Sequence, residues 1–466
     1  MSTLMRAFDG LEQWLNVRPF HFICVLFFVV SGSLLVFLTP PLQVPDENAH
    51  LVRAYQISEG AFISPQHKDA SGHVVSYHEK TPQSFLSLNK FSSPTGWEHS
   101  FSLPLIMDIL SMPLEAEYSV SIDIPNTGQY SPLSYLPQAL VARLCHELGM
   151  PLGLTFYLMR FSSLVLAAIC MFLSLRLLEE KTLLICLLFM MPMSMYEFAS
   201  VSADSSNVAL SMLITAFLLH LRNKGLFLGH GQLFLLIAAA VVLGLLKQVY
   251  GVILLLYFLI PGRLLGSSRR FCLVGGVLFS VFFAVSLAWT SVAYGGSEAL
   301  LGAASGINPR EQLTFIVHEP LQYAGILFAT ISEKFAYYGK EFVGTFGWLI
   351  IPLPTPFYFL YALLLIMGGL SGKIYLSLKQ RGIMLAGVLT SLFAIFFNLY
   401  LTWNPVGAPV IDGVQGRYAI PLALMLFTSF SCLKKLRYEK LIACAAGLIS
   451  AMLTIWSIWN HFYRVL

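Results

Sequence analysis

Apolar runs recur along the whole chain, and this feature constrains the fold more than any other. A membrane-spanning helix needs roughly 20 apolar residues. Because the runs are continuous and do not alternate, they predict helices and not the strands of a barrel. We predict an all-α fold, a polytopic transmembrane helical bundle of about 11 spans. The predicted spans lie near residues 20–39, 152–175, 182–200, 206–221, 232–246, 249–261, 271–294, 356–372, 382–402, 418–433 and 441–460.

The composition supports the same fold class. Charged residues make up 11% of the 466 residues, less than half of the roughly 25% in soluble domains, so a soluble globular protein is excluded. The net charge of +4 is too small to indicate nucleic acid as a partner. The seven cysteines show neither a disulfide framework nor the spacing of a zinc site.

Lysine and arginine are distributed unevenly between the loops, and this predicts the orientation. One set of short loops, together with the N-terminal segment, holds 16 of the 28 basic residues. Cytoplasmic loops carry such an excess, so we predict a cytoplasmic N-terminus and an outer C-terminus. The alternation is regular only if the apolar stretch 132–146, interrupted by Pro132 and Pro137, does not cross the membrane. We therefore interpret that stretch as re-entrant or interfacial.

A polar motif follows directly after the first predicted span. Pro45 is suited to the first turn of a helix, and the acids Asp46 and Glu47 are favourable at its positive end. On such a helix Asp46, His50 and Arg53 share one face, with Glu47 beside His50. A carboxylate next to a histidine and an arginine is suited to act as a general base. The alternative is a capped interfacial helix with a surface ion pair.

Four further ionisable residues lie toward the outer ends of predicted spans: Arg160, Asp204, Lys247 and Arg417. Ionisable residues within a membrane are functional candidates by default. Arginine and lysine both bind phosphate, so this group predicts a site for a lipid phosphate. The alternative is that the long side chains reach the membrane surface only to stay hydrated.

Two aromatic segments are also candidates. Tyr130 begins a stretch rich in tyrosine and proline that is suited to line a groove for a sugar or a lipid, although tyrosine is ordinary at a membrane interface. Trp348 follows Gly347 where the chain returns to the membrane, as in an aromatic belt. The outer loops contain no Asp-x-Asp pair, and no Walker-type phosphate loop occurs. We therefore expect no divalent metal and no ATP-driven pump.

Taken in order, these motifs resemble a family of bacterial polytopic membrane proteins found in surface-polysaccharide loci. That family is similar in layout to GT-C glycosyltransferases, and more loosely to phage-type glucosyltransferases that convert O-antigen serotype. The resemblance covers nearly the whole chain. It rests on Pro45-Asp46-Glu47-x-x-His50-x-x-Arg53, Tyr130-Ser131-Pro132, Ser202-Ala203-Asp204, Lys247, Gly347-Trp348, and Gln415-Gly416-Arg417-Tyr418 with Pro421.

The resemblance implies a multi-pass protein of the bacterial inner (cytoplasmic) membrane with its active face in the periplasm. It implies an inverting glycosyltransferase that uses a polyprenyl-phosphate sugar and acts on an O-antigen-like glycan of lipopolysaccharide. Asp46 is then the candidate base, with Glu47 as its substitute, and no cofactor or metal is expected. The implied supporting groups are His50, Arg53 and Tyr130 for the acceptor, Arg160, Lys247 and Arg417 for the lipid phosphate, and Asp204, Gln415, Trp348 and Tyr418 as further candidates.

On this interpretation the chain divides into a cytoplasmic N-terminus (1–19), a first transmembrane helix (20–39), a periplasmic loop with a re-entrant or interfacial helix (40–151), a transmembrane bundle (152–294), a periplasmic amphipathic segment (295–355) and C-terminal transmembrane helices (356–466). Two alternatives remain open, a flippase or transporter and a polymerase or ligase of lipid-linked polysaccharide. A transporter is expected to show paired repeats and broken helices near the membrane midplane. The sequence leaves the sugar, the linkage, the acceptor and the oligomeric state open.

Overall fold

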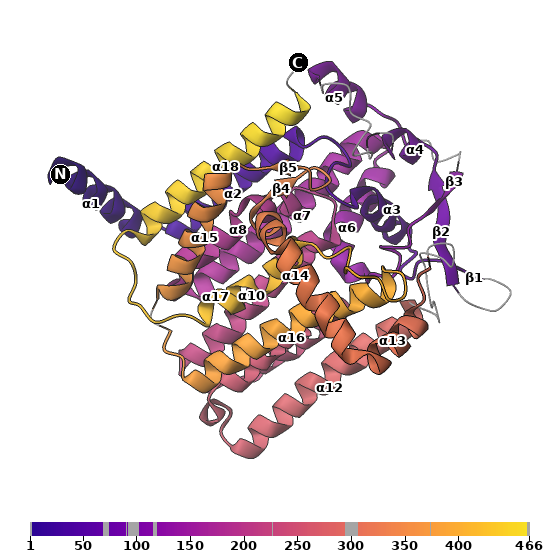
Figure 1. Ribbon diagram of the computed structural model, residues 1–466. Helices are drawn as coiled ribbons and strands as arrows, with labels where there is room; N and C mark the ends of the chain where they lie inside the picture. The colour runs from indigo at the N-terminus through magenta and orange to yellow at the C-terminus, as the bar shows by residue number, and fades with distance from the viewer. Residues whose placement is uncertain are drawn as a thin grey trace.

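The computed structural model is mostly helical, as the apolar runs predict (Figure 1). It describes residues 2–68, 74–89, 91, 102–114, 119–225, 227–293, 306–372 and 374–463. Within this part of the chain, six helices are long and apolar enough to cross a membrane. They are α2 (Phe20–Leu38), α7 (Leu152–Leu177), α10 (Ala203–Lys224), α12 (Ser268–Ala293), α16 (Leu378–Thr402) and α18 (Glu439–Phe462).

One predicted span is a broken helix. The short η2 (Glu179–Lys181) and α8 (Thr182–Phe189) are bent by 74° from α9 (Pro192–Phe198), and the three pieces together would make a seventh span. Pro192 stands at the start of α9. A proline has no N–H to donate to the preceding turn, so α8 cannot continue through it and the chain starts a new helix there.

The other four predicted spans also form helices, but these are shorter. They are α11 (His230–Leu245), η3 (Gln248–Leu259), α15 (Thr355–Leu370), and η6 (Gly416–Ala419) with α17 (Ile420–Thr428). The 12 residues of η3 form a 3₁₀-helix, which rises about 2.0 Å per residue and is seldom this long. All eleven apolar runs are thus helical, whereas by length and composition six or seven helices qualify as spans.

The segment between α2 and α7 contains more than the predicted interfacial helix. Its β1 (Gln66–Lys68), β2 (Val74–Pro82) and β3 (Ser119–Asp123) form an antiparallel sheet in the order β1-β2-β3, which the sequence did not predict. The 132–146 stretch forms η1 (Pro132–Tyr135) and α6 (Leu136–Glu147), and α6 is too short to span a bilayer. The remaining helices of this segment are α3 (Glu47–Ser58), α4 (Ser84–Asn89) and α5 (Leu103–Leu110).

The second long connection forms α13 (Pro309–His318) and α14 (Pro320–Val343). Two side chains of these helices accept hydrogen bonds from the loop that precedes η6. Gln312 accepts from the Gly407 N–H at 2.8 Å, and Thr330 accepts from the Ile411 N–H at 3.1 Å. A small hairpin of β4 (Thr345–Phe346) and β5 (Ile351–Pro352) then leads into α15.

The loops rich in lysine and arginine lie together at one end of the helices, where their cations bind backbone carbonyls at the ends of neighbouring helices. Lys181 donates to the Gly369 carbonyl at 2.7 Å, and Lys435 donates to the Glu179 carbonyl at 2.9 Å. In Figure 1, α1 (Ser2–Val17) projects on this side, and the β1–β2–β3 sheet lies at the opposite edge of the molecule.

Candidate functional site

Five charged side chains from separate segments meet beside the first turn of α10, and we call them the charge cluster: Asp46, Glu197, Asp204, Lys247 and Arg417. The Lys247 ammonium lies 2.6 Å from the Asp204 carboxylate. Arg417 bonds to Glu197 through Nη1, which also lies 3.8 Å from Asp204, and its Nη2 lies 3.6 Å from Asp46. The structure therefore brings together Asp46, Asp204, Lys247 and Arg417, which the sequence placed in four distant motifs.

Asp46 is the most accessible carboxylate of the cluster. Its side chain is 36% exposed, compared with 11% for Asp204 and 1% for Glu197. It occupies the N-cap position of α3 with a left-handed φ of 64°, and its side chain makes no capping bond. Instead, the Asn126 amide donates to its Oδ1 at 2.9 Å. The helix therefore starts at Glu47, two residues after the predicted start at Pro45, and Asp46 keeps its carboxylate available beside Arg417.

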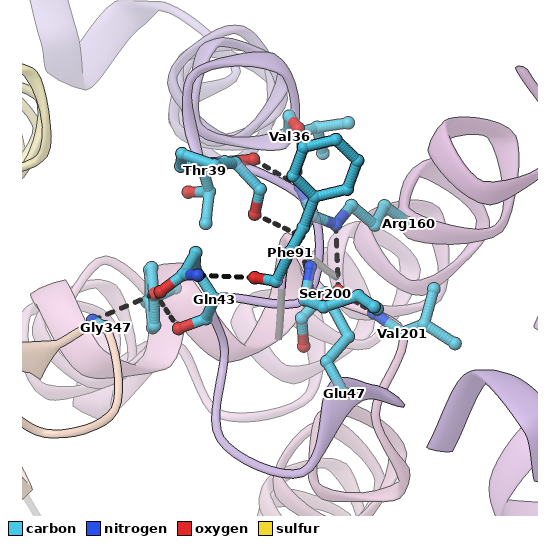
Figure 2. Close-up of polar contacts among 12 residues, drawn as sticks. Val36, Thr39, Gln43, Glu47, Phe91, Arg160, Ser200, Val201 and Gly347 are labelled. Carbon is cyan, nitrogen blue, oxygen red and sulfur yellow. Dashed lines mark hydrogen bonds and ion pairs between the residues drawn. The ribbon is translucent and has the colours of Figure 1, made fainter. Parts of the chain in front are cut away.

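Glu47 is completely buried, and all of its carboxylate oxygens are occupied (Figure 2). Arg160 donates to both oxygens, at 2.8 and 2.6 Å, and the N–H groups of Leu42 and Val201 donate at 3.0 and 2.9 Å. A carboxylate has about four acceptor positions, so none is left for a substrate hydroxyl. The prediction of Glu47 as a substitute base is therefore dropped, and Glu47 is a structural group.

Arg160 is also fully buried, and its five N–H groups all have partners. Two bind Glu47, and the others bind the carbonyls of Val36 at 3.1 Å, Thr39 at 2.6 Å and Pro40 at 3.0 Å (Figure 2). No donor remains for a phosphate, so the predicted lipid-phosphate role of Arg160 is also corrected. The pair joins α7 to the end of α2 and the start of α3.

His50 and Arg53 do not point at the same group, although both were expected beside the base. The His50 Nδ1 lies 2.6 Å from the Tyr135 hydroxyl, and the His50 ring stacks on that of Tyr130 at 6.2 Å. Burial lowers the pKa of His50 to about 4, so the ring is neutral at neutral pH. Arg53 is buried and donates to the carbonyls of Ala61, Phe62 and Tyr130. It therefore holds the backbone that presents Tyr130.

Lys247 occupies the break between α11 and η3. Its backbone N–H donates to the Asn207 side chain at 3.2 Å. Its ammonium lies 5.3 Å from the Tyr130 ring centre and 4.9 Å from that of Tyr418, so both aromatic faces contribute cation–π attraction. Tyr418 follows Arg417 in η6, which connects the lysine to the arginine of the cluster.

The turn that carries Arg417 is held from two sides. Gln415 accepts a hydrogen bond from the Arg417 Nε at 2.5 Å. The fully buried Glu341 of α14 accepts from the Gly416 N–H at 2.7 Å, and burial raises the pKa of this carboxyl. A side chain at residue 416 would be impossible without a shift, because a Cβ there would lie 1.9 Å from the Tyr338 carbonyl oxygen.

The Gly347-Trp348 segment lies near the Glu47–Arg160 pair and not in the charge cluster. The Gly347 N–H donates to the Tyr196 hydroxyl at 3.0 Å, and that hydroxyl donates to the Gln43 carbonyl at 2.9 Å (Figure 2). Trp348 is half-buried in the β4–β5 hairpin. The contacts of this segment therefore indicate a structural role in holding the chain after α2.

Two functional candidates were missed in the sequence. Glu197 lies in an apolar run, where the rule that flagged Arg160 also applies to an acid. Glu341 was recognised only as part of an amphipathic segment, and nothing in that pattern indicates its bond to Gly416. Among the described residues, no group of three or more His, Cys, Asp or Glu side chains has the geometry of a metal site. Metal-independent chemistry stays a prediction.

An open pocket adjoins the cluster on the side of Lys247. Its cavity volume is about 150 Å³. Lys247, Tyr130 and Tyr418 contribute to both the cluster and the pocket wall. The described lining residues are Gln129, Tyr130, Ser131, Ser134, Leu245, Leu246, Lys247, Gln248, Val249, Tyr250, Trp289, Ile395, Asn398, Leu399 and Tyr418.

Comparison with known proteins gives one family. The model of a family described as "Predicted membrane protein (DUF2142)" matches residues 27–426, from within α2 to within α17. No curated protein and no solved structure matches the chain significantly. The matched range contains all five residues of the charge cluster and every described residue that lines the pocket. Since the match covers most of the 466 residues, the chain belongs to this family of membrane proteins.

Proposed function

We propose that this protein is a membrane glycosyltransferase that moves a sugar from a polyprenyl-phosphate donor to an O-antigen-like surface glycan. The single observation that carries the proposal is the position of Asp46. Its accessible carboxylate lies in a cluster with two cations, and that cluster shares Lys247 with an aromatic pocket. A base, a cationic group and a binding pocket are the parts that such a displacement needs.

In the proposed reaction Asp46 is the general base. As the acceptor hydroxyl attacks the anomeric carbon, its proton moves to the Asp46 carboxylate. The new C–O bond forms while the bond from the anomeric carbon to the phosphate oxygen breaks, and the phosphate leaves with that electron pair. A single displacement inverts the anomeric centre. The bond from Asn126 orients Oδ1, and Oδ2, which lies 3.6 Å from the Arg417 Nη2, takes the proton.

The charges of the cluster fit this proton transfer. The cluster contains three carboxylates and two cations, so it carries no surplus positive charge for a phosphate. When Asp46 takes up the proton, it loses its negative charge as the leaving phosphate gains one, and the total charge of the site stays the same. Lys247 faces the pocket and is the cation best placed to stabilise that phosphate. Arg417 acts instead through Asp46 and Asp204.

The proposal includes a topology. The four short apolar helices and the bent α8–α9 pair complete a set of about 11 crossing segments. The N-terminus and the lysine-rich loops lie in the cytoplasm of a bacterial inner membrane, and the charge cluster lies at the periplasmic face. Lipid-linked donors are a natural energy source there, because nucleotide sugars and ATP are absent from the periplasm.

A flippase for lipid-linked oligosaccharides is a second candidate, because one feature favours it. The bent α8–α9 pair is the kind of broken helix that transporters place at their substrate site. Buried hydroxyls on the neighbouring α10, at Ser205, Ser211 and Thr215, have no partner within the described part of the chain. Flipping needs no general base, so the role of Asp46 separates the two functions.

The test is mass spectrometry of surface glycan from cells that make O-antigen and lipid-linked sugars. Wild type should add one sugar to each repeat, and Asp46→Asn should lose that increment while remaining in the membrane. Asp108→Asn, an exposed acid of α5, is the matched control and should behave as wild type. A full increment from Asp46→Asn would overturn the proposed base. A change in chain length without a new sugar would indicate a polymerase or a flippase.

A further inference from the structure

The pocket beside Lys247 is lined by both aromatic rings and hydrogen-bonding side chains. Aromatic rings from Tyr130, Tyr250, Tyr418 and Trp289 form part of its wall. Amide and hydroxyl groups form another part, from Gln129, Gln248, Asn398, Ser131 and Ser134. The ring faces suit apolar C–H groups, and the amides suit hydroxyls, so the lining fits a ligand that presents both in one small ring.

The pocket offers no uncompensated charge. Among the described lining residues none is acidic, and Lys247 is the one cation. Lys247 is already paired with Asp204 at 2.6 Å, and its side chain is only 18% exposed. If Lys247 also stabilises the donor phosphate, as proposed above, a further anion such as a sugar carboxylate would have no cation of its own and would be poorly solvated, which is costly in a buried site. The ring that enters the pocket is therefore uncharged.

One lining group lacks a partner that a ligand can supply. Ser131 is 2% exposed, and its hydroxyl has no hydrogen-bond partner within the described part of the structure. A buried hydroxyl without a partner is unfavourable. A ligand hydroxyl in the pocket would satisfy it. Leu245, Leu246 and Leu399 also line the pocket and give an apolar surface suited to the first carbons of a lipid.

From these observations we propose that the pocket binds the neutral pyranose ring of a substrate, and that it rejects sugars with a carboxylate. The inference rests on the proposed function and specifies its substrate class. The same chemistry is available from the donor sugar or from a sugar of the acceptor glycan, and the experiment distinguishes these sources.

Binding is measured on purified protein with Asp46→Asn, so that no transfer complicates the result. The probes are citronellyl-phosphate hexoses (glucose, galactose, mannose and rhamnose), citronellyl-phosphate glucuronic acid, citronellyl phosphate alone, and maltotriose as a free neutral glycan. We expect at least one neutral lipid-linked sugar to bind about tenfold more tightly than the glucuronic acid probe. Preferential binding of maltotriose would assign the pocket to the acceptor.

Two variants connect the binding to the pocket. Asn398→Leu and Ser131→Ala each remove a hydrogen-bonding group from the lining, and either should weaken binding of the neutral sugar about tenfold. Binding of citronellyl phosphate alone should not change. Asn223→Leu, an exposed asparagine at the other end of α10, is the matched control. The proposal is overturned if glucuronic acid binds equally well, if no neutral probe binds, or if both pocket variants bind as the control does.

The outcome is separate from that of the proposed function. If the neutral sugar binds in the pocket but wild type transfers nothing to glycan, the pocket assignment stands and the transferase is wrong. If wild type transfers a sugar that the pocket variants bind normally, the transferase stands and the pocket assignment is wrong.

Discussion

Asp46 and Glu47 are adjacent in the chain, yet they take part in different arrangements. Glu47 points into a buried network with Arg160, and Asp46 lies beside Arg417. The left-handed backbone at Asp46 separates the two directions. Such a conformation is uncommon for residues other than glycine, although aspartate tolerates it better than most. The strain lies at the residue that we propose as the base, which is where strained backbone is often found.

Substituting Glu47 should lower the thermal stability of the protein more than substituting Asp46. Removing one partner of a buried ion pair costs about 3–5 kcal/mol, so Glu47→Gln should unfold at a clearly lower temperature than wild type in detergent. Asp46→Asn should unfold within a few degrees of wild type, because its side chain is partly exposed. Thermal unfolding followed by circular dichroism checks both. Equal stability of the two variants would contradict the structural role of Glu47.

Lys247 should affect use of the donor more than use of the acceptor. Lys247→Met removes the ammonium that faces the pocket, and we expect the apparent KM for the lipid donor to rise at least tenfold while that for the acceptor changes less. Lys224→Met, at the far end of α10, serves as the control. An unchanged KM for the lipid donor would remove Lys247 from the phosphate site.

His50 should make the protein less stable in acid. Burial lowers its pKa to about 4 in the folded protein, from an ordinary value of 6.5. Protonation therefore favours the unfolded chain, so this stability is complete above pH 6.5 and is lost as the pH falls toward 4. The loss is on the order of 3 kcal/mol. Unfolding of wild type and His50→Gln at pH 7, 6, 5 and 4.5 tests this, and a parallel decline in both would contradict it.

Among the elements, the broken α8–α9 helix and the α14 helix determine the site from two sides. The break at Pro192 allows α9 to bring Glu197 to Arg417. Helix α14 holds the turn that carries Arg417, because the Glu341 carboxylate accepts a hydrogen bond from the Gly416 N–H. Neither helix supplies the proposed base, but both position the arginine beside it.

Alanine substitutions at Gly416 and at Gly339 should affect transfer differently, because only Gly416 lies against the backbone of α14. Gly416→Ala would place a Cβ 1.9 Å from the Tyr338 carbonyl oxygen, so the turn must shift and transfer should fall at least tenfold. Gly339→Ala, in α14 itself, meets nothing within 4 Å and should keep full activity, with a gain in helix stability of up to about 1 kcal/mol. A fully active Gly416→Ala would show that the α14 contact does not position Arg417.

At the scale of the whole molecule, the charge cluster and the basic loops lie at opposite ends of the helices. Asp204 lies in the first turn of α10 and Arg222 in its last, and 22 residues of α-helix separate these turns by roughly 30 Å. This is close to the thickness of a hydrocarbon core. The arrangement agrees with a helix that crosses the membrane with its basic end in the cytoplasm.

Reporter fusions test that orientation. Alkaline phosphatase fused after Leu466 should be active, because the phosphatase folds only in the periplasm. Green fluorescent protein at the same site should be dark, because it becomes fluorescent only in the cytoplasm. The same reporters in the loop between α10 and α11 should give the reverse result. Active phosphatase in that loop would show that the positive-inside assignment is wrong.

Hydropathy and charge were enough to predict a helical membrane protein, because burial of apolar runs in lipid is a local property of the sequence. The same reasoning found Asp46, Asp204, Lys247 and Arg417, since ionisable groups near apolar runs are rare and conspicuous. It could not separate the roles of Asp46 and Glu47 or assign Arg160 to a structural pair. It also did not detect Glu197 as the fifth member of the charge cluster. It also predicted about 11 spans where six or seven helices have the length. The charge pairings depend on contacts between residues more than 100 positions apart, such as Glu47 with Arg160 and Glu197 with Arg417. Only the packing of the helices brings such residues together, so the tertiary structure alone decided which charges pair and which one stays accessible.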